Sequence, residues 1–220
     1  VAIILDGNKR WADKKKISRS EGYEAGFNKI LEIANHSIKL NVSDLTLFTL
    51  SSENYYRKSI SIIYDLIYKN FDDFINKIIE KKNIKINIFG NRNNLPDNII
   101  EIFKKCEKST FENKTLNLNL AFNYGFKDEI RKVLFEYIKN HKNTNINDIN
   151  NINDLFFLKN KPDPDILIRT GGYKRLSNFI MYNLTYTELF FTDTLWPDFT
   201  KEELEKFVND FYKVDRKYGL

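Results

Sequence analysis

Short apolar runs that each stop at a cluster of polar residues are the feature that most constrains the fold of this chain. The first run covers residues 1–5 and is continuous, which is typical of a strand buried on both faces of a sheet. It stops at a polar stretch: Asp6, Gly7, Asn8, Lys9, Arg10 and Trp11. Comparable runs follow along the chain, at residues 44–50, 84–89, 115–122, 165–168 and 188–191.

Between these runs, apolar residues recur every three or four positions, which indicates helices. We expect one helix that Ser20 caps and three helices over residues 60–81, 98–106 and 130–138. A capping box formed by Thr200 and Glu203 is expected to open a last helix. Strands that alternate with helices predict an α/β fold, with a mostly parallel central sheet of about six strands flanked by helices. Residues 1–220 are predicted to form a single domain. An Asn-rich loop is expected at residues 143–153, followed by a marginal helix at 155–158.

Charge and composition narrow the possible partners. A net charge of +5 permits nucleic acid, anionic lipid or phosphorylated metabolites. The aromatic residues follow the periodicity of a core, which argues against nucleic-acid binding. The single cysteine, Cys106, falls on the apolar side of a helix, is expected in the core and fits a reducing compartment. Since no apolar run reaches the roughly 18 residues that span a bilayer, and no signal-peptide pattern opens the sequence, we expect a cytoplasmic protein that contacts the inner face of the plasma membrane only peripherally.

One acid among many bases follows the first apolar run. Gly7 allows the backbone after Asp6 to turn and to approach a ligand closely. The basic residues that follow are Lys9, Arg10, Lys14, Lys15, Lys16 and Arg19. This combination indicates a site for a magnesium diphosphate. The alternative is an ordinary Asp-Gly turn followed by a run of basic residues on a solvated face.

A second group of anion-binding residues follows the run at 165–168. Arg169 and Arg175 supply forked donors, two adjacent glycines allow backbone amides to converge on an oxygen, and Ser177 adds a hydroxyl. The alternative is a tight turn with surface arginines. In parallel sheets, ligands bind at the carboxyl ends of the strands, so the two groups together suggest an enzyme that brings two diphosphates together. Neither a dinucleotide-binding glycine motif nor a Walker loop is present.

Several blocks, in order along nearly the whole chain, resemble the signature blocks of the cis-prenyltransferases, and in particular those of the bacterial undecaprenyl diphosphate synthases. They cover residues 6–12, 51–54, 123–125, 165–172, 175–179 and 186–199. The resemblance implies repeated condensation of isopentenyl diphosphate onto an allylic diphosphate, expected to be farnesyl diphosphate. It implies a long-chain product, undecaprenyl diphosphate for the cell-wall (peptidoglycan) lipid carrier, with a shorter-chain cis-prenyl diphosphate as the alternative.

The resemblance also implies Mg²⁺ as cofactor, a homodimer formed by elements near the carboxyl end, and transient contact with membrane lipid during product release. A growing apolar chain requires an apolar tunnel between the sheet and the helices, and the candidate wall residues are Thr49, Ile63 and Phe71.

Roles for individual residues are carried over from the same resemblance. Asp6 would hold magnesium together with Glu188 and promote departure of the allylic diphosphate, and Asn54 would act where isopentenyl diphosphate loses its proton. The expected allylic diphosphate ligands are Gly7, Asn8, Arg10 and Arg19, with Tyr23 as a phenol donor. The expected isopentenyl diphosphate ligands are Arg169, Arg175 and Ser177. Ser51 would lie beside Asn54, and Trp11 and Tyr55 would lie near the apolar part of the substrate. The remaining expected substrate contacts are Lys9, Ser52, Glu53, Arg57 and Leu176.

Three positions depart from the family pattern. Tyr23 replaces a common histidine, Tyr55 replaces a usual tryptophan, and Lys174 stands where related bacterial enzymes can carry histidine.

Three other functions are alternatives to a prenyltransferase. A phosphatase with Asp6 as nucleophile would require an acid at Asn8, a nucleic-acid-binding module would require exposed aromatics, and a non-catalytic prenyltransferase subunit would lack Asp6.

Overall fold

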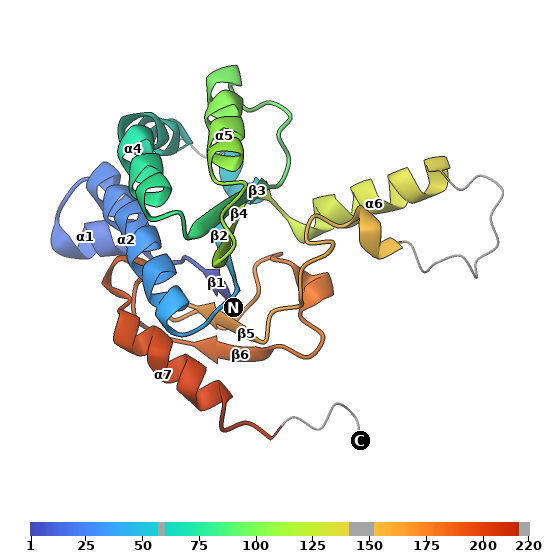
Figure 1. Cartoon of the computed structure of the whole chain (residues 1–220). Helices are drawn as coiled ribbons and strands as arrows, with labels where there is room; N and C mark the ends of the chain where they lie inside the picture. The colour runs from blue at the N-terminus through green and yellow to red at the C-terminus, as the bar shows by residue number, and fades with distance from the viewer. Residues whose placement is uncertain (57–59, 141–151, 216–220) are drawn as a thin grey trace.

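The protein is described here by a computed structural model that covers residues 1–56, 60–140 and 152–215. Its strands are β1 (Ala2–Ile4), β2 (Asp44–Ser51), β3 (Ile84–Phe89), β4 (Leu116–Tyr124), β5 (Ile166–Arg169) and β6 (Glu188–Phe191). Within the described residues these six strands form one sheet, in the order β3-β4-β2-β1-β5-β6, and every pair is parallel (Figure 1). The predicted α/β class and strand number are therefore confirmed.

Helices connect the strands, largely where the sequence predicts them. They are α1 (Asn8–Lys15), α2 (Arg19–Lys39), α3 (Ser52–Tyr55), α4 (Ile60–Lys81), α5 (Asp97–Ser109), α6 (Phe126–Asn140) and α7 (Lys201–Phe211). The capping box of Thr200 and Glu203 is confirmed. The cap of α2 was predicted wrongly, because Ser18 rather than Ser20 accepts the N–H of Glu21 and forms a capping box with it.

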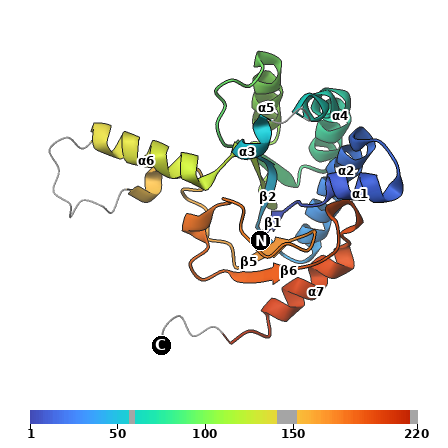
Figure 2. The same cartoon turned by 180° about the vertical axis from the view of Figure 1, so that it is seen from behind.

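Four helices cover one face of the sheet. Apolar side chains of α2, α4, α5 and α7 share a core with alternate residues of the strands, such as Ile3, Leu47 and Ile86. The second face is covered mainly by residues 157–158 and 176–184, and the latter include the short 3₁₀ helix η2 (Met181–Asn183). Figures 1 and 2 show that α6 extends away from the sheet rather than lying on it.

Three further predictions concern single segments or residues. Most of the predicted Asn-rich loop lies outside the described residues. The marginal helix predicted at 155–158 is wrong in position, because the 3₁₀ turn occupies 152–155. Cys106 is buried in the core as predicted. Across the described ranges, the helices are all too short or too polar to cross a bilayer.

Candidate active site

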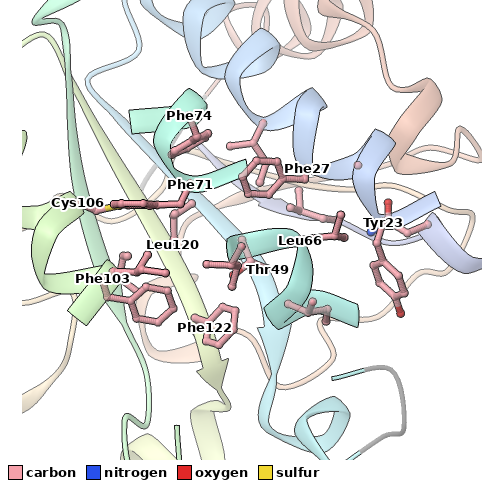
Figure 3. Close-up of a pocket in the computed structure, with 18 of the residues that line it drawn as sticks. Tyr23, Phe27, Thr49, Leu66, Phe71, Phe74, Phe103, Cys106, Leu120 and Phe122 are labelled. Atoms are coloured by element: carbon pink, nitrogen blue, oxygen red, sulfur yellow. The ribbon is translucent and has the colours of Figure 1, made fainter. Parts of the chain in front are cut away.

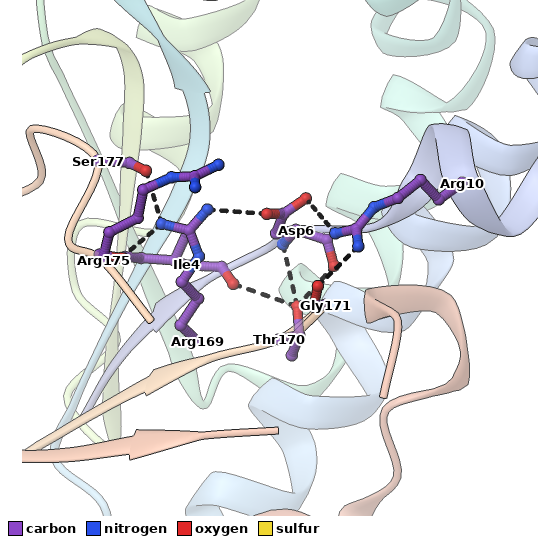
Figure 4. A network of polar contacts seen from close by, with 8 residues as sticks. All are labelled: Ile4, Asp6, Arg10, Arg169, Thr170, Gly171, Arg175 and Ser177. Carbon is purple, nitrogen blue, oxygen red and sulfur yellow. Dashed lines mark hydrogen bonds and ion pairs between the residues drawn. The ribbon is translucent and has the colours of Figure 1, made fainter. Parts of the chain in front are cut away.

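Asp6 and Arg169 meet because β1 and β5 are neighbouring strands. Ile4 pairs with Arg169, and Asp6 follows two residues later. The Arg169 Nη2 donates to Asp6 Oδ2 at 2.8 Å, and Arg10 Nη2 donates to Asp6 Oδ1 at 3.0 Å (Figure 4). The Arg169 side chain is 4% exposed and that of Asp6 is 26% exposed. One partly exposed carboxylate is thus held between two guanidinium groups.

The other edge of the Arg169 guanidinium organises the second group of residues. Its Nη1 donates to the Arg175 carbonyl at 2.5 Å and to Ser177 Oγ at 2.6 Å. Since the Ser177 oxygen accepts from Arg169, its own proton remains available to donate to a ligand oxygen. Ser177 has a left-handed backbone, with φ of 50°, and this conformation turns the chain back toward Arg169.

Thr170 and Gly171 join the two groups through the backbone. The Asp6 N–H donates to the Thr170 hydroxyl at 3.0 Å, and that hydroxyl donates to the Asp6 carbonyl at 2.8 Å. Arg10 Nη1 donates to the Gly171 carbonyl at 2.7 Å. Gly171 has φ of 84°, and a Cβ there would lie 2.5 Å from Arg10 Nη2. A side chain at Gly171 would therefore displace Arg10.

The two groups line one cleft of about 730 Å³ at the carboxyl ends of the strands. The predicted site residues that it brings together are Asp6, Gly7, Asn8, Lys9, Tyr23, Ser51, Glu53, Asn54, Arg169, Arg175 and Ser177. Tyr173 also lines the cleft, although it was not among the predicted site residues. Its place between two glycines and two basic residues is the only signal in the sequence that could have found it.

Three other predicted site residues form hydrogen bonds outside the cleft. Trp11 Nε1 donates to Asp198 Oδ1 at 2.7 Å, Ser52 Oγ donates to Asp128, and the Tyr55 hydroxyl donates to the Asn94 carbonyl. None of the three lines the cleft.

Arg19 and Leu176 do not line the cleft either. Arg19 is exposed at the start of α2, and Leu176 packs against the core of the second sheet face. Arg57 lies outside the described residues.

Glu188 does not line the cleft. It is the first residue of β6 and pairs with Ile166, whereas Arg169 and Phe191 pair at the other end of the same two strands. Glu188 therefore lies about 10 Å from the level of Arg169 along the strands, and two strand spacings from β1. Within one chain, Glu188 is not brought together with Asp6.

An apolar cavity of about 130 Å³ adjoins the cleft (Figure 3). It lies between α2, α4, α5 and the sheet, and the predicted wall residues Thr49, Ile63 and Phe71 all line it. Cys106 lines it too, and burial raises the pKa of this thiol to about 12. Cleft and cavity share five lining residues, namely Leu5, Asn8, Tyr23, Thr49 and Ile63.

Comparison with known proteins identifies the family. A family model for undecaprenyl diphosphate synthase matches residues 4–219. The chain belongs to the undecaprenyl diphosphate synthase family of prenyltransferases. An isoprenyl transferase of Aquifex pyrophilus is 36% identical over 100% of this chain and 94% of its own length. An isoprenyl transferase of Listeria monocytogenes is 35% identical over 100% of this chain and 89% of its own length.

Solved structures of similar proteins agree with this family. Lavandulyl diphosphate synthase from Lavandula x intermedia, in complex with dimethylallyl diphosphate, has a TM-score of 0.88 and 26% identity. A protein described as a probable undecaprenyl diphosphate synthase from Campylobacter jejuni has a TM-score of 0.79 and 28% identity. Both comparisons cover 100% of this chain and 97% of the other. The protein is therefore a prenyltransferase with the fold of this family.

The residues around Asp6 fit the magnesium that this family implies. Among the described residues no cluster of three or more His, Cys, Asp or Glu side chains could hold a metal. Magnesium in phosphate-processing sites is usually held by one or two carboxylates, by substrate phosphates and by water. Each Asp6 oxygen accepts one arginine N–H and retains a further lone pair. Asp6 can therefore bind magnesium that arrives with a diphosphate.

Proposed function

We propose that this prenyltransferase condenses isopentenyl diphosphate repeatedly onto an allylic diphosphate, with farnesyl diphosphate as the first acceptor, and forms cis double bonds. The observation that carries the proposal is the continuity between the cleft and the apolar cavity. Arg169, as a diphosphate donor, and Asp6, as a magnesium ligand, would act in the cleft, and the residues that the cleft shares with the cavity would guide an apolar chain inward. Residues 1–220 would act as one catalytic domain.

The allylic diphosphate would bind where α1 begins. No side chain of the described residues caps the start of α1, so the backbone N–H groups of its first turn could bind an anion, and Gly7, with φ of 129°, permits the tight turn before them. Lys9 lines the cleft at the same place. When bound to Asp6, magnesium would neutralise charge that develops on the departing diphosphate. Arg10 is held by Asp6 in advance, so it needs little reorganisation to stabilise the same charge.

Isopentenyl diphosphate would bind on the opposite side of Asp6. Arg169, Arg175 and Ser177 provide donors for its diphosphate, and each charge-assisted hydrogen bond contributes about 1.5–3 kcal/mol. Ser51 and Asn54 line the cleft where the new bond would form, and the proton would be lost beside them. The Ser51 hydroxyl accepts the Asn54 N–H and so fixes the start of α3.

Product length would be set by the apolar cavity. Each isoprene unit gains roughly 4 kcal/mol on leaving water, so a growing chain would enter the space between α4 and the sheet. We propose undecaprenyl diphosphate as product, which requires the cavity to widen into a tunnel. A shorter-chain product is the second candidate, and it is supported by the small cavity and by the similarity to lavandulyl diphosphate synthase.

We also propose a homodimer and a cytoplasmic location. β6 is an edge strand, and Leu189 on it is 45% exposed, so a second copy of the chain could cover this edge in a homodimer. The enzyme would work in the cytoplasm and contact membrane lipid transiently, because lipid would accept a long apolar product. Nucleic acid is not an expected partner.

The experiment is product analysis by mass spectrometry after incubation of the purified chain with farnesyl diphosphate, isopentenyl diphosphate and magnesium. Prenyl diphosphates longer than farnesyl diphosphate support the function, and their length distinguishes the two candidate products. Absence of any elongated product would refute it.

A further inference from the structure

Tyr173 places one aromatic ring against the arginines of both diphosphate-binding groups. The Arg175 Cζ lies 4.1 Å from the ring centroid, and the Arg10 Cζ lies 4.7 Å from it. The Arg169 Cζ is more distant, at 5.8 Å. Distances within about 6 Å are those of cation–π contacts. Arg10 comes from α1 and Arg175 from the segment after β5, so a single side chain links two parts of the site that are far apart in the sequence.

The backbone holds Tyr173 in this position. The N–H groups of Gly171 and Gly172 donate to the carbonyls of Thr194 and Thr192, both at 2.8 Å. Both glycines have positive φ, 84° and 82°, which turns the chain so that the next residue lines the cleft. Tyr173 is nevertheless 43% exposed, so its ring adds little to the core. The position of Tyr173 is therefore better explained by a role in the cleft than by a contribution to the stability of the fold.

An uncharged ring orders cations without neutralising them. A carboxylate beside Arg175 would pair with it and compete with an incoming diphosphate. The face of an aromatic ring attracts a guanidinium through its quadrupole and leaves the N–H groups free for phosphate oxygens. Among the described residues, no carboxylate forms an ion pair with Arg175. The Tyr173 ring is therefore the group that restrains this side chain before substrate binds.

We propose that Tyr173 is a positioning residue that pre-orders Arg10 and Arg175 and so serves both diphosphate-binding groups at once. This inference rests on the proposed function, which supplies the two substrates, an allylic diphosphate and isopentenyl diphosphate. Each diphosphate depends on one of these two arginines, and one cation–π contact at a partly exposed site corresponds to about a 2- to 5-fold change in affinity. The expected effect is on substrate binding, because the ring orders the arginines before either diphosphate arrives.

The test compares wild type with Tyr173→Leu, which removes the ring face, and Tyr173→Phe, which keeps it. We expect Tyr173→Leu to raise the KM for each diphosphate by about 2- to 5-fold with a smaller change in kcat, and Tyr173→Phe to keep both KM values at the wild-type level. Tyr182→Leu is the matched control. Tyr182 is 41% exposed and stacks on Phe156 rather than on an arginine, so both KM values should stay at wild-type level.

Binding of inorganic diphosphate with magnesium, measured by calorimetry, separates this inference from the proposed function. A wild-type chain that forms no prenyl product would refute the proposed function. Weaker diphosphate binding in Tyr173→Leu, with wild-type binding in Tyr173→Phe, would still support the role of the ring. The inference is overturned if a folded Tyr173→Leu binds inorganic diphosphate like wild type, if only one KM rises, or if Tyr173→Phe fails to restore binding.

Discussion

Replacing Asp6 with asparagine should affect both stability and turnover, because Asp6 is the only carboxylate that the described structure pairs with Arg169. Removal of one partner of a buried ion pair costs about 3–5 kcal/mol. The Arg169 side chain is 4% exposed, but that of Asp6 is 26% exposed, so water can replace part of the lost interaction. We therefore expect Asp6→Asn to lower the free energy of unfolding by about 2–3 kcal/mol. Turnover should fall at least about 100- to 1000-fold, since a preorganised group at the departing diphosphate is lost.

Urea unfolding and a prenyl-transfer assay measure the two effects separately. Asp210→Asn is the matched control, because it removes a carboxylate from the surface ion pair with Lys213. That change should alter the free energy of unfolding by less than about 1 kcal/mol and leave turnover intact. An Asp6→Asn protein as stable as wild type would refute the ion-pair argument. Near-normal turnover would refute the catalytic role.

Three further predictions concern Ser177, Cys106 and Glu129. Ser177→Ala should raise the KM for isopentenyl diphosphate about 10- to 100-fold in steady-state kinetics, because one charge-assisted hydrogen bond is lost; an unchanged KM would contradict it. Cys106→Phe should shorten the products seen by mass spectrometry, because the thiol lines the apolar cavity, whereas Cys106→Ala should not shorten them. Burial raises the pKa of Glu129 above its ordinary 4.5, so the folded state favours the protonated form. The free energy of unfolding should therefore fall as pH rises from about 4.5 through the raised pKa, and Glu129→Gln should remove this fall in urea titrations.

The strands and long helices could be predicted because local pattern and burial agree. The stripe of apolar residues at 60–81 and the alternation at 84–89 gave the bounds of α4 and β3. α1 was not predicted, because its eight residues are mostly polar and carry no apolar stripe. It forms against α2, where a Cβ at Gly22 would lie 2.8 Å from the Ala12 Cβ. That contact depends on tertiary structure, and no local pattern reveals it.

The site was predictable by residue type but not by arrangement. Polar residues after apolar runs correctly indicated that Asp6 and Arg169 would lie at the carboxyl edge of the sheet. Sequence order carries no information on strand register, so the separation of Glu188 from Asp6 could not be seen. Tyr173 was overlooked for a similar reason, since its role depends on arginines brought close to it by two separate segments.

The most direct test of the account is a crystal structure with isopentenyl diphosphate, magnesium and an unreactive analogue of the allylic diphosphate. We predict one diphosphate beside Asp6 and the start of α1, the other on Arg169, Arg175 and Ser177, and the allylic chain in the apolar cavity beside α4. Diphosphates bound away from Asp6, or an allylic chain directed away from that cavity, would contradict it.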